Sequence, residues 1–128
     1  MRVEDVDIAT LDDLVDDLAD LRHDLGKYIG FESRNAEPEQ LRKALMRDLH
    51  ATREHTGKSE SCWELWARLR PSALDDDPDV LAIDQALEAL RIDLDTADDR
   101  ALQEARHRAS GVTAATKRLH ARALAARG

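Results

Sequence analysis

Leucine recurs at alternating steps of three and four residues along residues 11–28, a series that a tyrosine completes. This spacing keeps one stripe of an α-helix against a neighbour, because the helical repeat is about 3.6 residues. The stretch therefore predicts a helix that packs along its whole length. We expect it to begin after Thr10, a favourable N-cap, or earlier near Glu4, and to end near Arg34, ahead of the next proline.

Two shorter helices are expected after the first. Pro38 suits the first turn of a helix that carries a leucine stripe and is expected to end near Gly57. Ser61 and Glu64 are three residues apart, which is the sequence of a capping box, and they predict a short helix that Pro71 ends.

Two further helices complete the chain. Asp77, followed by a proline, has the residue types of an N-cap and first helical position. Thr96 is expected to cap the last helix, because the phase of the apolar pattern shifts there and then stays in register through Gly111. No period-2 strand pattern stands out, so the sequence predicts an all-α fold. We expect an antiparallel bundle of four to five helices that forms one domain over residues 1–128.

The composition limits which kinds of partner the protein is expected to bind and which cellular compartment it is expected to occupy. The chain has 27 acids, 19 bases and a formal net charge of −8, which argues against nucleic acid as a partner because the phosphate backbone is polyanionic. The sequence has no apolar run long enough for a membrane span and no basic and apolar start typical of a secretory signal. Cys62 is the single cysteine and has no internal disulfide partner. We therefore expect an acidic, cytoplasmic protein with no membrane partner.

The charges are unevenly distributed along the chain. Residues 1–24 hold nine acids and two bases, whereas the residues after Glu104 hold six bases and no acid. Attraction between the two ends predicts that the first and last helices are antiparallel, with both chain ends at one end of the bundle. The side chains expected to approach one another are Asp12, Asp13 or Asp16 and Lys117, Arg118 or Arg122.

The face of the first helix opposite the leucine stripe carries His23, Gly26, Lys27 and Gly30. A glycine inside a helix costs roughly 0.8–1 kcal/mol relative to alanine, so two glycines one turn apart indicate that something approaches closely. Another helix of the same chain and a docked partner both explain them. We predict that His23 is at least partly exposed on a shallow surface of small residues.

The run RHDLGK, which starts at Arg22, resembles the H-box of histidine-kinase dimerisation helices and, less closely, the motif of histidine phosphotransfer domains. The resemblance implies that His23 accepts a phosphoryl group and that Asp24 is the neighbouring acid. It also implies that Gly26 leaves room for a response-regulator receiver domain, and that Lys27 holds phosphoryl oxygens.

Trp63 and Trp66 lie on one side of the short third helix. We expect them to cap the end of the core. The alternative is an exposed aromatic pair that anchors a partner, since tryptophan is favoured at binding hot spots.

Two carboxylate–histidine pairs, Asp20 with His23 and Glu104 with His107, have the spacing of ligands in di-metal helical bundles. The helical phase places both histidines away from the core stripe, so we predict no metal site and no cofactor.

The sequence thus favours a non-enzymatic protein–protein interaction module, an adaptor or regulatory protein of the kind used in signalling. The alternative is a histidine phosphotransfer protein that accepts a phosphoryl group on His23. Another protein is the expected partner, and a receiver domain is the partner under the alternative. The sequence leaves the oligomeric state open, with a dimer as one option.

Overall fold

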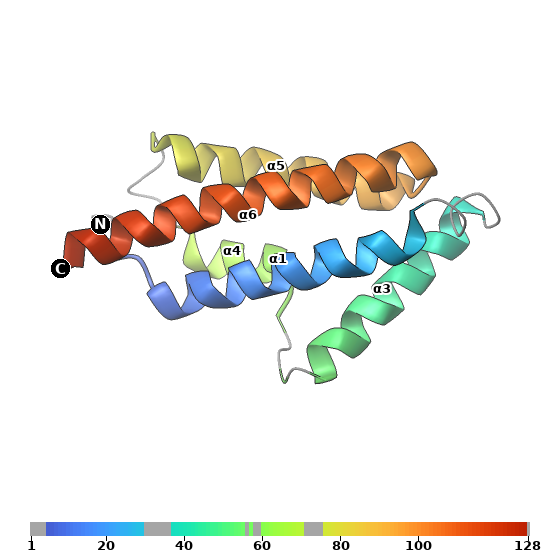
Figure 1. Ribbon diagram of the computed structural model, residues 1–128, viewed down its shortest axis with the longest axis horizontal. Helices are drawn as coiled ribbons and strands as arrows, with labels where there is room; N and C mark the ends of the chain where they lie inside the picture. The colour runs from blue at the N-terminus through green and yellow to red at the C-terminus, as the bar shows by residue number, and fades with distance from the viewer. Residues whose placement is uncertain (1–4, 30–36, 56, 58–59, 71–75, 128) are drawn as a thin grey trace.

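The computed structural model describes residues 5–29, 37–55, 57, 60–70 and 76–127. Five α-helices pack against one another, and the described residues include no strand (Figure 1). This confirms the predicted all-α fold. The helices are α1 (Ile8–Tyr28), α3 (Pro38–His55), α4 (Cys62–Leu69), α5 (Pro78–Thr96) and α6 (Asp99–Arg127).

The three longest helices form the body of the bundle. In Figure 1, α6 runs antiparallel to both α1 and α5, and α3 crosses the bundle obliquely beside α1. The helices α3 and α4 both pack against α1. The chain ends lie at one end of the bundle, where a guanidinium nitrogen of Arg127 donates to the carbonyl of Val6 at 2.6 Å. The predicted antiparallel arrangement of the first and last helices is therefore confirmed.

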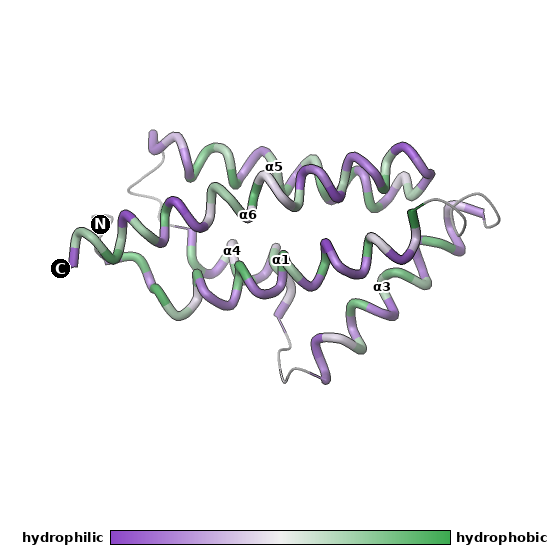
Figure 2. Tube along the Cα trace, in the orientation of Figure 1, coloured by the Kyte–Doolittle hydropathy of each residue, from purple (hydrophilic) through white to green (hydrophobic). Residues whose placement is uncertain are grey.

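The core consists of the predicted apolar stripes. The leucines of α1 from Leu11 to Leu25 are all fully buried, and hydrophobic and hydrophilic stretches alternate along the helices in Figure 2. On α6 the buried positions include small residues such as Ala105 and Ala109. Small side chains let helix axes approach closely, which suits the long contact that α6 makes with both neighbours.

The ends of α1 differ from the prediction. Asp7, not Thr10, is the N-cap, because its carboxylate accepts the backbone N–H groups of Ala9 and Thr10. The hydrogen bond from the Thr10 hydroxyl is the main reason why the pKa of Asp7 is lowered. At the other end Ile29 has extended backbone angles, so the helix ends at Tyr28 rather than near Arg34.

The caps of α4 and α5 match the sequence signals. Ser61 and Glu64 form a complete capping box, in which each side chain accepts the other residue's backbone N–H. Asp77 caps α5, and Pro78 occupies its first turn. The predicted role of Pro71 lies outside the described residues.

The junction between α5 and α6 differs by two residues from the prediction. Thr96 is the last residue of α5 rather than a cap of α6, and Ala97 ends that helix in the left-handed region at φ 51°. Asp98 then caps α6 by accepting the backbone N–H of Ala101 at 2.8 Å. The helix continues without interruption through Gly111, as predicted.

The basic end of α6 pairs with the start of α5. Arg118 Nε lies 3.0 Å from Asp79 Oδ1, and Arg122 contacts both Asp77 and Asp79. The hydrogen bonds from Arg122 lower the pKa of Asp77. Arg118 and Arg122 therefore pair with acids at the start of α5 rather than with the expected acids of α1. Asp12 of α1 does approach this part of α6, where its Oδ1 lies 2.9 Å from Nε2 of His120.

None of the helices in the described ranges is both long enough and apolar enough to cross a membrane.

Candidate functional site

An open groove runs between α1 and α6. It consists of two adjoining pockets of about 330 and 390 Å³, which share Arg22 and Arg106. We call it the α1–α6 groove. It is lined by Val15, Ala19, Arg22, His23 and Ile29 on the α1 side and by Gln103, Arg106, His107, Ser110, Thr113 and Lys117 on the α6 side.

The α1–α6 groove is basic in a chain that is acidic overall. Arg22, Arg106 and Lys117 are exposed, and among the described residues their side chains have no counterion or hydrogen-bond partner. The imidazoles of His23 and His107 are also exposed. No acidic side chain is among the described residues that line the groove. The groove therefore concentrates positive charge that the described part of the chain does not neutralise.

Gly26 allows a side chain of α6 to lie over α1. A Cβ atom added at Gly26 would lie 3.9 Å from the guanidinium carbon of Arg106, which is ordinary van der Waals contact. The close approach that the glycine indicated is thus made by a flexible arginine and not by a helix backbone, and Gly26 stays exposed. Gly30, the other glycine of this pattern, lies outside the described residues.

His23 and Asp24 face different neighbours. His23 is exposed, as predicted, whereas Asp24 is only 1% exposed and accepts the hydroxyl of Thr52 on α3 at 3.1 Å. Lys27 lies beside that carboxylate, with 3.3 Å between Nζ and Oδ1. Consecutive residues of a helix point about 100° apart, so an acid directly after His23 turns away from the exposed face. The structure thus gives Asp24 a contact with α3 and pairs Lys27 with Asp24, which differs from the site roles that the resemblance implies.

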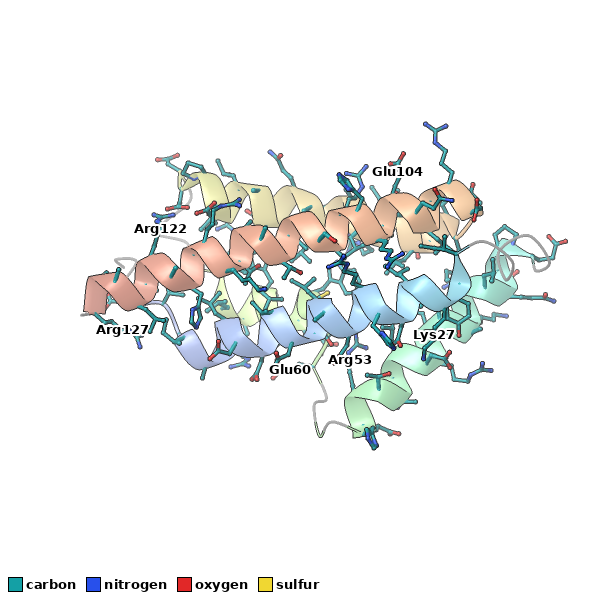
Figure 3. The ribbon with its side chains drawn as sticks, viewed as in Figure 1. Lys27, Arg53, Glu60, Glu104, Arg122 and Arg127 are labelled. Atoms are coloured by element: carbon teal, nitrogen blue, oxygen red, sulfur yellow. The ribbon has the colours of Figure 1, made fainter. Side chains whose placement is uncertain are left out.

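A second buried acid on α1 was missed from the sequence. Asp17 is 2% exposed and accepts two hydrogen bonds from the guanidinium of Arg53 on α3, at 2.9 and 3.4 Å. Figure 3 shows Arg53 between these two helices. The available signal was the spacing of Asp17 and Asp24, seven residues apart on one helical face, which predicts a polar neighbour on that side. Burial and the nearby Asp17 charge raise the pKa of Cys62, so this thiol stays protonated.

The two tryptophans attach α4 to α5. Trp66 is 5% exposed and donates its indole N–H to Asp84 at 2.6 Å, while Trp63 donates to the carbonyl of Leu87 at 2.9 Å. Burial raises the pKa of Asp84, but hydrogen bonds from Arg70 and Trp66 outweigh it and hold that pKa below its usual value. Trp66 therefore caps the core, as predicted, and is not available as an exposed anchor.

The carboxylate–histidine pairs do not assemble into a cluster. Within the part of the chain that the structure describes, no group of three or more histidine, cysteine or acidic side chains is placed to hold a metal ion.

Protein-family models, curated proteins and solved structures yield no match to this chain. What the α1–α6 groove can do therefore follows from its own residues. Three exposed cations and two imidazoles in one open channel favour contact with negatively charged groups. The small side chains of Ala19 and Gly26 leave the α1 side of the channel accessible.

Proposed function

We propose that this protein is a non-enzymatic interaction module, an adaptor or regulator, which binds another protein through the α1–α6 groove. The observation that carries the proposal is the exposure of Arg22, Arg106 and Lys117 in one groove without counterions among the described residues. By contrast, Arg53 and Arg122 are each paired with an acid on a neighbouring helix. Charges that the chain leaves unpaired are available to steer and orient a partner.

A site-specific crosslinking experiment tests this docking surface. A photoreactive amino acid at Ala19, inside the groove, is expected to capture a discrete partner in the native host, and the same group at Gln85 on the exposed side of α5 is the control. Gly26→Trp is expected to abolish the capture at Ala19 while leaving the thermal melt intact, because its bulk displaces only the flexible Arg106 side chain. Equal capture at both positions, or capture that survives Gly26→Trp, contradicts the proposal.

The second candidate is phosphotransfer through His23. The exposed His23 lines the same pocket as Arg106 and Lys117, and two cations beside an imidazole suit the oxygens of a phosphoryl group. A neutral imidazole nitrogen is a competent nucleophile for such a transfer. Asp24 and Lys27 do not contribute here, since they pair with each other.

Acid-labile phosphate on the protein, after mixing with a phosphorylated receiver domain or a histidine kinase and ATP, tests this second function. His23→Gln is expected to abolish the label, whereas His107→Gln, which changes the other groove histidine, is expected to retain it. An unlabelled wild-type protein, or a label that persists in His23→Gln, rejects phosphotransfer and leaves the docking proposal standing.

A further inference from the structure

We infer that the α1–α6 groove takes a short acidic segment of the partner protein, a run of aspartate and glutamate side chains in extended conformation. This inference rests on the proposed function and specifies the chemistry of the bound segment. The charge of the groove supports this inference directly, since the described residues that line it include three cations and no acid.

The spacing of the cations favours a series of carboxylates over a single anion. Arg106 and Lys117 are eleven residues apart on α6, which is about 16 Å along a helix axis. One phosphate is too small to contact both ends of such a row. An extended peptide advances about 3.3 Å per residue, so a run of about five or six residues spans the same length.

The groove lacks the large aromatic side chains on which the bases of single-stranded nucleic acid stack most extensively. Proteins that bind single strands stack the bases on aromatic rings. None of the described residues that line the α1–α6 groove is tryptophan, tyrosine or phenylalanine; besides the cations and imidazoles they are aliphatic, amide or hydroxyl side chains. Carboxylates need only cationic or N–H donors, which the guanidinium groups of Arg22 and Arg106 supply.

The surroundings of the groove disfavour long polyanions. Asp12 and Asp16 on α1 lie within one turn of the groove residue Val15 and are exposed, and Oδ1 of Asp12 lies 2.9 Å from Nε2 of His120 on α6. Together with the net charge of −8, these acids repel an anionic polymer or membrane that extends beyond the groove, over a screening distance of about 10 Å. A segment confined to the groove meets the cations without that repulsion.

Binding of a defined peptide tests the inference. The probe is a fluorescein-labelled peptide of about eight alternating aspartates and glutamates, measured by fluorescence anisotropy, with its asparagine–glutamine counterpart as the neutral control. The acidic peptide alone is expected to bind, and its affinity is expected to fall at least about tenfold between about 50 and 500 mM salt, because exposed charge pairs are screened.

Charge-matched variants separate the groove from a general charge effect. Arg22→Gln with Arg106→Gln is expected to weaken binding at least about tenfold, a loss that corresponds to about 1.4 kcal/mol. Lys43→Gln with Arg91→Gln removes the same charge from α3 and α5 and is expected to stay within about twofold. Circular dichroism melts of both double variants show whether each one is folded.

Three results would overturn the inference: no binding of the acidic peptide, equal losses in the two double variants, or tighter binding of a single-stranded oligonucleotide or of anionic phospholipid vesicles. The crosslinking experiment at Ala19 is independent of this peptide. Capture there that Gly26→Trp abolishes, together with a peptide that does not bind, rejects the acidic segment but retains the docking surface.

Discussion

The helix α1 presents charged side chains on two sides, and the two sides differ in how those charges are treated. Towards α3, Asp17 and Asp24 are buried, and each is held by a side chain of that helix. Towards α6, Arg22 and His23 are exposed and line an open groove. A charge removed from water needs a partner, whereas an exposed one does not. The paired side therefore specifies how α3 docks, and the unpaired side is available for binding.

The largest expected effect tests whether the paired side extends to α4. Trp66→Ala is expected to lower the free energy of unfolding by about 3–5 kcal/mol, because it removes a buried indole and its hydrogen bond to Asp84. Trp63→Phe, at a half-buried position, is the milder control and is expected to cost about 1 kcal/mol. Urea unfolding measures both changes. An unchanged midpoint for Trp66→Ala would show that α4 is not part of the cooperative core.

Removal of one partner from each side of α1 compares the two sides directly. Arg53→Ala is expected to cost about 3 kcal/mol, since it leaves Asp17 buried without its cation and Arg53 is itself only partly solvated. Arg22→Ala removes an arginine on the groove side and is expected to change stability by less than about 0.5 kcal/mol. Chemical denaturation of the two variants gives the comparison, and equal effects would erase the distinction between the sides.

Low pH is expected to weaken the contacts that the Asp84 carboxylate makes with Arg70 and Trp66. The folded pKa of Asp84 lies below its usual value near 3.8, so the contribution of this carboxylate is fully present above that value and is lost as pH falls through the lowered pKa. Asp84→Asn should therefore differ in melting temperature from the parent at pH 6, and the difference should shrink towards pH 2. The loss of stability in Asp84→Asn is expected to be smaller than that in Trp66→Ala, because Arg70 and Asp84 are partly solvated. A melting-temperature difference between Asp84→Asn and the parent that is constant with pH would contradict this prediction.

A small gain in stability, opposite in sign to the losses above, is expected at Gly26. Gly26→Ala should raise the free energy of unfolding by up to about 1 kcal/mol, because alanine is the better helix former and the new Cβ makes only ordinary contact with Arg106. Thermal melts measure the gain. A loss of stability would mean that Arg106 cannot give way, and that the groove is packed more tightly at this point than the open side of α1 indicates.

Particular residues show where sequence analysis succeeded and where it did not. The exposure of His23 and the burial of Trp66 were predicted, because both follow from the phase of one helix. The burial of Asp24 was missed, because it depends on where α3 crosses α1. Lys117 and Arg106 were not recognised as neighbours of His23, because they belong to a helix about 80 residues later in the chain.

The sequence alone determined the helices, their buried stripes and the caps of α4 and α5, because these depend on residues within a few positions of one another and on the 3.6-residue repeat. The antiparallel order of the first and last helices was also predicted from the opposite charges of the two ends, although Arg118 and Arg122 of α6 pair with acids of α5. The tertiary structure decided which charges are paired. Arg122 meets Asp77 of α5 rather than an acid of α1, and Arg106 of α6 lies over Gly26. Such pairings depend on how whole helices are placed side by side, and no local pattern in the sequence encodes that placement.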